Sequence, residues 1–394
     1  MTAFDTALSR LAAAPPAAPA IALAEIEGRL AALRAALRTA GVKAAWLDAS
    51  AALRYFTGTA LGLSERIHGA LVPAEGPVLW LTPAFEAPKL QRLMRIQGPL
   101  LEWEEDEDPF ALLAGALAAH AAPGRGLALD PATPFGFAER IARAMAPEPV
   151  TSAEPLITPL REVKSPAEVA IIEAAMQASL RLQRAVHDGL RPGVSTAEVA
   201  AFVDAGHAAM GMAPLFSAVQ FGEATAYPHG VPAPQILAEG DMVLVDMGGV
   251  LEGYLSDLTR TYVFGRPTDR QRRLWAVEQA AQAAAFAAIR PGAPCGAVDA
   301  AARGAIEAAG FGPGHAVPGL PHRTGHGLGL DIHEAPWIVR GNAAPLRPGM
   351  VFSIEPMLCV YGECGVRLED FALVTETGAR WLTAPSPSLD APFG

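Results

Sequence analysis

The stretch VLVDMGGVLEGYLSDLTRTYVFG, residues 243–265, places Asp246 and Asp257 inside two strongly apolar runs that are typical of strands. Strands disfavour aspartate, and a buried carboxylate is costly unless a positive partner compensates its charge. Three glycines, which are common turn residues, lie between the two aspartates. A hairpin that bends about residues 251–252 would put the two carboxylates opposite each other, with Cβ atoms roughly 5 Å apart. Because two bare carboxylates would repel, the sequence predicts a cation between them.

A second pair of acids repeats this arrangement downstream. In VFSIEPMLCVYGECGVRLEDFALVT, Glu355 and Glu369 lie in apolar strand-like runs and are equally far from Gly362, the predicted turn. Arg367 is two residues from Glu369 and is therefore expected on the same face of its strand, whereas Asp370 is expected to point the other way. The two hairpins together predict four carboxylates that share one site.

Histidines supply the remaining candidate ligands. The segment PHRTGHGLGLDIHEAP, residues 321–336, contains His322, His326 and His333 among closely spaced glycines that allow backbone to approach closely. Four carboxylates and a histidine suit a pair of divalent ions better than a single zinc, which prefers nitrogen and sulfur ligands. Two such ions bridged by carboxylates, roughly 3.5–4 Å apart with a hydroxide between them, perform metal-assisted hydrolysis. The alternative to a metal site is that each acid is a core carboxylate held in a salt bridge.

His229 is a separate candidate in the loop ATAYPHGVPAP. A histidine in a loop rich in proline and glycine is usually only solvated. Its position just before the first acid-bearing strand favours a role at the predicted site.

Composition narrows the class of protein without naming a function. The chain has 394 residues, of which 51% are hydrophobic and 18% charged, as expected for two or three globular domains. A formal charge of -11 without a lysine or arginine cluster argues against binding to nucleic acid or to an anionic membrane. The three cysteines, at 295, 359 and 364, are irregularly spaced, which fits a protein in a reducing compartment. A disulfide between Cys359 and Cys364 is the minor alternative.

The N-terminal segment is not expected to be a secretory signal. Asp5 stands where a positive charge is needed, and prolines at 15, 16 and 19 interrupt any apolar core of a signal peptide. No apolar run reaches the length of about 18 residues that a transmembrane helix requires. The sequence therefore predicts a cytoplasmic protein.

The chain is predicted to contain two domains. Residues before 160 alternate helical and strand-like runs, as in an α/β domain, with a helix that ends at Gly41. A linker-like segment with Pro155 and Pro159 follows. The predicted domains are therefore an N-terminal α/β domain over residues 1–160 and a second domain over residues 161–394.

Helix-start signals and a weak repeat organise the second domain. Long helices are predicted near residues 166, 196 and 269, because Ser165, Ser195 and Thr268 each precede a glutamate or glutamine by three positions. LRPGVSTAEVAAFVDAGHAAMG resembles IRPGAPCGAVDAAARGAIEAAG at an offset of 99 residues. Chance similarity of alanine-rich helices is one explanation. The other is a duplicated helix-plus-hairpin unit whose two halves join their strands in one sheet.

The motifs LVDMGG…GYLSDLTRTYVFG, HRTGHGLGLDIHE, FSIEPM and GVRLEDFALVT resemble the metallopeptidase family of methionine aminopeptidase, aminopeptidase P and prolidase. The resemblance covers residues from about 165 to 380. It implies an α/β (α+β) fold class, with a pseudo-symmetric C-terminal domain of the pita-bread fold that carries catalysis. The preceding residues resemble the smaller creatinase-like domain of prolidase and aminopeptidase P.

The resemblance also implies a role for each candidate residue. Asp246 binds one metal ion, His326 and Glu355 bind the other, and Asp257 and Glu369 bridge them. His229 and His333 contact the substrate, and His333 stabilises the tetrahedral intermediate. The remaining matches, His322 and Arg367, line the proline side. Many relatives have a tyrosine about fourteen residues before the loop histidine, whereas this chain has Leu215 and Phe216 in that region, so a hydrogen bond to a ligand aspartate is expected to be missing or replaced.

The expected activity is hydrolysis of the Xaa-Pro bond at a dinuclear metal site, with Glu355 as general base for the bridging water. An Xaa-Pro dipeptidase (prolidase) is favoured, and an Xaa-Pro aminopeptidase that acts on longer peptides is the alternative. A lyase or amidinohydrolase, or a binding protein on the same fold, is the remote alternative. Manganese is the favoured ion, with cobalt and zinc as alternatives. The resemblance also implies a homodimer, and a proline-containing peptide as substrate.

Overall fold

The computed structural model describes residues 3–394, and its contacts divide the chain into two compact units. One unit comprises residues 21–161, and the other comprises residues 162–394 together with residues 3–20. The predicted N-terminal domain therefore differs from the observed unit at its start. Helix α1 (Ala3–Ala12) packs against the second unit, where the ring of Phe4 stacks on Phe202 with centroids 4.1 Å apart.

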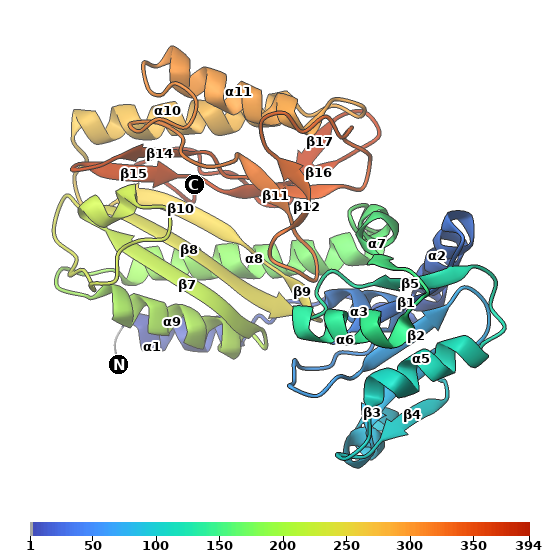
Figure 1. Cartoon of the computed structure of the whole chain (residues 1–394). Helices are drawn as coiled ribbons and strands as arrows, with labels where there is room; N and C mark the ends of the chain where they lie inside the picture. Colours follow the sequence, from blue (N-terminus) through green and yellow to red (C-terminus); the bar gives the residue numbers. More distant parts are fainter. Residues whose placement is uncertain (1–2) are drawn as a thin grey trace. The chain divides into compact units, whose positions relative to one another are not determined.

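The unit of residues 21–161 is built on one mixed six-stranded sheet in the order β4-β3-β2-β1-β5-β6 (Figure 1). Its helices and strands are α2 (Leu23–Ala40), β1 (Val42–Asp48), α3 (Ala51–Thr57), β2 (Gly69–Pro73), β3 (Leu79–Pro83), α4 (Ala87–Leu93), β4 (Leu100–Trp103), α5 (Pro109–Ala119), β5 (Arg125–Leu129), α6 (Phe135–Met145), β6 (Val150–Ser152) and α7 (Glu154–Arg161). Helix α2 ends before Gly41, which has a φ of 67°, as predicted.

Helix α7 corrects the predicted linker around Pro155 and Pro159. Pro155 lies in the first turn, where a backbone N–H has no intrahelical partner, so proline is tolerated there. Pro159 lies inside the helix, and Ile157 is buried between the two prolines. Burial of an apolar side chain therefore outweighs the unfavourable helix propensity of proline.

The unit of residues 162–394 carries its long helices on the outer sides of its strands (Figure 1). Its helices are α8 (Pro166–Gly189), α9 (Thr196–Ala209), α10 (Asp269–Ala287) and α11 (Cys295–Ala308). Its strands are β7 (Ala213–Phe221), β8 (Met242–Leu251), β9 (Tyr254–Leu255), β10 (Leu258–Val263), β11 (Gly325–Gly327), β12 (Glu334–Ile338), β13 (Val351–Ile354), β14 (Met357–Val360), β15 (Cys364–Arg367), β16 (Asp370–Val374) and β17 (Ala379–Trp381). Short 3-10 turns are η1 (Ala84–Glu86) in the first unit and η2 (Gly222–Ala226) in the second.

The predicted helix starts are confirmed. Ser165, Ser195 and Thr268 each form a complete capping box with the glutamate or glutamine three positions later. Helices α9 and α11 have the same length of 14 residues at the predicted offset of 99. The repeat is therefore present in the fold.

The two halves do not share one continuous sheet, contrary to the prediction. Strands β10, β8, β7 and β9 form one sheet, β12, β11, β13, β16 and β17 form another, and β14 pairs with β15 alone. The halves meet where the backbone N–H of Glu369 donates to the carbonyl of Thr259 at 3.2 Å. Continuous strand pairing stops there, because Asp257, Glu355 and Glu369 lie between strands and not within them.

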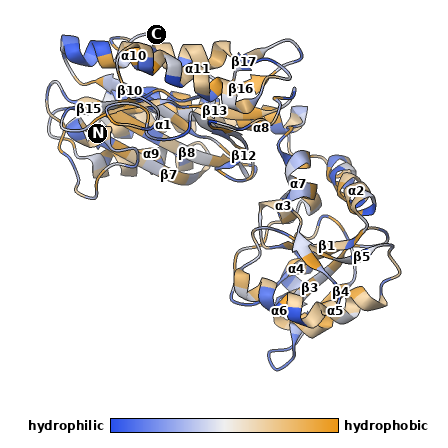
Figure 2. Cartoon of the chain, turned by 45° about the horizontal axis from the view of Figure 1, so that its top comes forward, coloured by the Kyte–Doolittle hydropathy of each residue, from blue (hydrophilic) through white to orange (hydrophobic). Residues whose placement is uncertain are grey.

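Most of the core lies between the strands and the long helices, and Figure 2 shows strands of this unit in hydrophobic colours beside the hydrophilic start of α10. In the described residues, no helix combines the length and the apolar character needed to cross a membrane.

Glu278, on α10, is an exception in this core because its carboxyl group is fully buried. Burial raises the pKa of Glu278 well above its ordinary value of 4.5, and the nearby charge of Arg367 opposes this only in part. The folded chain therefore keeps a proton on Glu278 at pH values where the unfolded chain has released it.

Replacing Glu278 with glutamine is expected to raise the melting temperature, and more so at pH 8 than at pH 5. The wild-type free energy of unfolding falls as the pH rises above the ordinary glutamate pKa, because the folded state binds more protons. The amide does not titrate and avoids this loss. Thermal unfolding from pH 5 to 8 measures the difference, with the exposed Glu376→Gln as control. A gain that is the same at every pH would contradict the assignment.

Candidate metal centre

The first acid-bearing hairpin turns one residue later than predicted. Glu252 and Gly253 form the bend with φ values of 50° and 86°, and Asp246 is opposite Thr259 instead of Asp257. The prediction that the two aspartates are directly opposite is therefore wrong. The residue opposite Asp246 is two positions further along the strand than predicted. Because side chains alternate with a period of two, both aspartates still face the same side of the hairpin.

The second hairpin has the predicted register. Met357 pairs with Arg367 on one side of the acids and Ile354 pairs with Asp370 on the other. Both pairings are centred on Gly362, which has a φ of 79°. Glu355 and Glu369 therefore lie between the two ladders. Asp370 points away from them, as predicted, into a buried ion pair with Arg260 at 2.7 Å.

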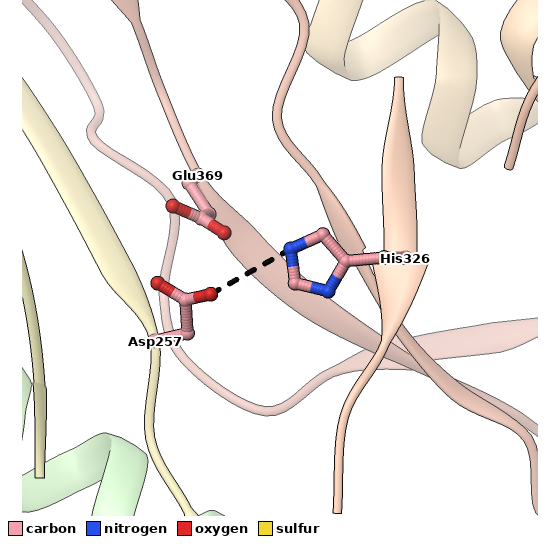
Figure 3. Close-up of side chains that lie close together, drawn as sticks. All are labelled: Asp257, His326 and Glu369. Carbon is pink, nitrogen blue, oxygen red and sulfur yellow. Dashed lines mark ion pairs between the residues drawn. The ribbon is translucent and has the colours of Figure 1, made fainter. Parts of the chain in front are cut away.

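Three of the predicted ligands form a compact buried cluster. Asp257, His326 and Glu369 each offer a ligand atom, and these atoms lie within 4.8 Å of one another. Figure 3 shows the three side chains pointing toward a common point. The Nε2 atom of His326 lies 3.6 Å from Asp257 Oδ2 and 3.0 Å from Glu355 Oε1.

The tautomer of His326 suits a metal ligand. Its Nδ1 lies 3.0 Å from the carbonyl of Gly327, which can only accept a hydrogen bond. Nδ1 therefore carries a proton, and Nε2 points at the carboxylates. Although burial opposes it, the charge of Glu355 raises the pKa of His326, so without an ion Nε2 is protonated as well, and a bound cation would take the place of that proton. An orienting hydrogen bond of this kind is common for metal-binding histidines.

The charges of the cluster call for a cation. Burial, and then the charge of Asp246, raises the pKa of Asp257 well above its usual range. Burial and Asp257 do the same for Glu369. Asp246 Oδ1 and Glu369 Oε1 are buried without a hydrogen-bond donor in the described residues. Carboxylate oxygens that repel one another and lack donors fit hard divalent ions.

Glu355 differs from these acids because it is paired. Burial alone would raise its pKa, but the charge and hydrogen bond of His326 hold the pKa at about 2. Ser353 also donates to Glu355 Oε1 at 3.1 Å. Glu355 is therefore an ionised carboxylate at the edge of the cluster.

Sequence reasoning missed two hydroxyl groups that hold the acids in place. Thr259 Oγ1 donates to Glu369 Oε2 at 2.6 Å, which leaves Oε1 facing the cluster. Ser353 Oγ accepts from the backbone N–H of His326 at 2.9 Å and so joins a histidine and a glutamate. Thr259 is two residues after Asp257, so the alternation of side chains along a strand could have predicted that it faces the same site.

Arg367 is a hydrogen-bond donor to Asp246. Its Nη2 donates to Asp246 Oδ2 at 2.7 Å, and its Nη1 donates to the carbonyl of Pro228 at 3.0 Å. Arg367 therefore lies on the predicted face of its strand, and its guanidinium is a donor to Asp246 in the structure. Phe216, in the region of the absent tyrosine, lines the cavity instead.

All nine predicted site residues line one cavity of about 790 Å³. The acids, Asp246, Asp257, Glu355 and Glu369, and His326 share it with His229, His322, His333 and Arg367. The ring of His333 is 4.3 Å from that of His326, edge to face. Burial, and then the charge of His326, lowers the pKa of His333 below its ordinary value. His333 is therefore neutral near pH 7 and can donate one hydrogen bond.

A buried ion pair beside His333 was also missed. Lys164 Nζ lies 2.6 Å from Glu334 Oε1, and the lysine side chain is 1% exposed. This contact ties the start of the second unit to the residue after His333. No local sequence signal indicates it, because 170 residues separate the partners.

The three cysteines are buried and unpaired, so the disulfide alternative is not observed. Burial raises the pKa of Cys359 to about 12 and those of Cys295 and Cys364 to about 11. Thiols that stay protonated are poor nucleophiles, which agrees with the absence of a predicted catalytic role.

Comparison with known proteins gives the family. Residues 170–376 match metallopeptidase family M24, and residues 29–163 match the creatinase/prolidase N-terminal domain. The chain belongs to metallopeptidase family M24. This M24 enzyme is 36% identical over 355 residues to the probable dipeptidase PepE of Mycobacterium tuberculosis, covering 89% of this chain and 92% of the relative.

Two further relatives agree with this assignment. The crystal structure of dipeptidase PepE from Mycobacterium ulcerans has a TM-score of 0.84 and 36% identity, covering 93% of this chain and 97% of that one. The Xaa-Pro dipeptidase of Lactobacillus helveticus is 29% identical over 350 residues, covering 88% of this chain and 94% of the relative. The predicted family and fold are confirmed, and the M24 enzyme is a metal-dependent peptidase.

Proposed function

We propose that this M24 enzyme cleaves the Xaa-Pro bond of dipeptides with two divalent ions, manganese being favoured. The observation that carries the metal site is the cluster of buried carboxylates around Asp257 and His326, two of whose oxygens lack a donor. The proposed ligands are those that the motifs predict: Asp246, Asp257, His326, Glu355 and Glu369. When bound, the ions supply Lewis acidity and lower the pKa of a water molecule.

Glu355 is the general base in this proposal. Its carboxylate faces the cluster and could accept a proton from the attacking water, whose own pKa the ions would lower. It then delivers the proton to the leaving proline nitrogen. Proton delivery is essential because the departing group is a secondary amine. The hydrogen bond from Ser353 keeps the carboxylate oriented during both transfers.

His333 and His229 bind the substrate backbone on the open side of the cluster. Both are exposed to the cavity, unlike the buried His326. The neutral His333 donates to the carbonyl oxygen as negative charge develops there, which stabilises the transition state more than the ground state.

Preference for proline rests on the relatives and on the chemistry of the bond. The bond before proline is a tertiary amide without an N–H, so an enzyme must recognise the ring and cannot rely on a donor. His322 lines the same cavity and donates from Nδ1 to the carbonyl of Arg323 at 2.7 Å. Its Nε2 atom is left for the substrate. His322 and Arg367 are both candidates for the carboxylate of a dipeptide. Arg367 is already paired with Asp246, and His322 can donate to a carboxylate from Nε2 only as the imidazolium, because its Nδ1 proton is already used.

The test is hydrolysis of Ala-Pro, Ala-Ala and Ala-Pro-Ala-Ala by metal-free protein reloaded with Mn, Co or Zn. Cleavage of Ala-Pro alone supports the proposed Xaa-Pro dipeptidase. Equal cleavage of Ala-Ala contradicts the preference for proline. Cleavage of Ala-Pro-Ala-Ala alone would assign an Xaa-Pro aminopeptidase, and silence on all three substrates with every ion would reject the proposal.

A further inference from the structure

We infer that Gln183 and Gln282 are positioning residues that set the separation of the metal-binding carboxylates. The two glutamines are related by the same 99-residue offset as helices α9 and α11. Both side chains are buried, with 0% and 2% exposed, and neither lines the cavity. The inference rests on the proposed ligand set and adds residues that act through it.

Gln183 joins the two strands of the first hairpin. From α8, its Nε2 donates at 2.9 Å to the carbonyl of Val245 and at 2.9 Å to the carbonyl of Leu258. Val245 directly precedes Asp246, and Leu258 directly follows Asp257. One amide group therefore connects the backbone on which both aspartates are carried.

Gln282 makes the equivalent connection in the second hairpin. From α10, its Nε2 lies 3.1 Å from the carbonyl of Leu368 and 3.4 Å from that of Ile354. These residues directly precede Glu369 and Glu355. The same nitrogen lies 3.1 Å from Asp370 Oδ2, so its two protons are shared among three acceptors.

The glutamines act beside acids that lie at the ends of regular strand pairing, although Val245 and Leu258, the acceptors of Gln183, belong to one ladder. Asp257 lies between β9 and β10, Glu355 between β13 and β14, and Glu369 between β15 and β16. Backbone that leaves a ladder no longer has its spacing set by strand-to-strand hydrogen bonds. An amide that donates to both chains of a hairpin adds a fixed connection next to the acids and ties it to a helix. Both hairpins use the same residue type for this purpose.

The second hairpin has an additional support behind Gln282. Asp370 also accepts hydrogen bonds from Arg260 at 2.7 Å and Thr383 at 2.6 Å. Arg260 in turn donates to the carbonyl of Glu369 at 2.9 Å. Loss of Gln282 therefore leaves part of the support for Glu369 in place, and loss of Gln183 leaves the ladder between β8 and β10 in place. Effects of similar size are therefore expected for the two glutamines.

The test compares Gln183→Leu and Gln282→Leu with Gln177→Leu. Gln177 lies on α8 as well and donates to a backbone carbonyl, that of Leu382, which adjoins none of the acids. Mn²⁺ affinity is measured by calorimetry, and Co²⁺-loaded protein is examined by visible absorption, which reports ligand geometry. The first two variants are expected to bind Mn²⁺ at least about tenfold more weakly and to change the Co²⁺ spectrum. For Ala-Pro, kcat is expected to fall with KM nearly unchanged.

Variants that replace each glutamine with glutamate test the same contacts while keeping the length and shape of the side chain. A protonated glutamate keeps one of the two donors, so intermediate Mn²⁺ affinity is expected. Unchanged affinity in the leucine variants, or an equal loss in Gln177→Leu, would overturn the inference. Failure of the leucine and glutamate variants alike to fold would assign the glutamines to stability alone, which also overturns it. Absence of Mn²⁺ binding by the wild-type protein would instead reject the proposed function.

Discussion

Replacing Asp257 with asparagine is expected to lower kcat/KM for Ala-Pro by at least about 10³-fold, because the change removes the charge at the centre of the site. Asp257 is 4% exposed, and its Oδ2 lies 3.6 Å from Nε2 of His326. The amide keeps the shape of the side chain but offers a single neutral oxygen ligand. Steady-state kinetics in excess Mn²⁺ and calorimetric metal titration measure the two consequences.

Asp48→Asn is the matched control for this substitution. Asp48 is also a buried aspartate, but it accepts hydrogen bonds from Trp46 and Ala49 in the other unit of the chain. It is expected to alter stability while leaving metal binding intact. Wild-type turnover by Asp257→Asn, measured on folded protein, would remove Asp257 from the catalytic site.

Removing divalent ions with a chelator is expected to abolish hydrolysis and to lower the melting temperature of the catalytic unit by about 10 °C or more. Each ion present at 100 times its dissociation constant stabilises the folded state by about 2.7 kcal/mol. Two ions therefore contribute about 5 kcal/mol, and 1 kcal/mol shifts the melting temperature of a unit of this size by about 2–4 °C. The ions also neutralise carboxylates that otherwise repel one another.

Calorimetric scans before and after chelation, with and without added Mn²⁺, measure this effect. Asp257→Asn provides the internal control, because a chain with a weakened site should respond less to chelation and to Mn²⁺. Identical melting temperatures for the chelated and Mn²⁺-loaded wild-type protein would contradict a metal site in this cluster.

Local signals in the sequence were sufficient for several parts of the fold. The capping boxes at Ser165, Ser195 and Thr268 mark helix starts because each motif satisfies its own backbone donors within four residues. The second hairpin follows its predicted register because Gly362 provides the turn and the acids are symmetric about it. The alternation of side chains along a strand also places Arg367 and Asp370 on opposite faces.

Other parts depended on contacts between distant segments. The bend at Glu252 and Gly253, the helix through Pro159 and the docking of α1 each differ from the local reading, because neighbouring elements supply the burial that decides them. Strand periodicity brings four carboxylates to one side, but their separation depends on amides and hydroxyls contributed from elsewhere, such as Gln183 and Thr259. A pattern along the chain specifies which side chains face one another, whereas long-range hydrogen bonds set the distances that chemistry requires.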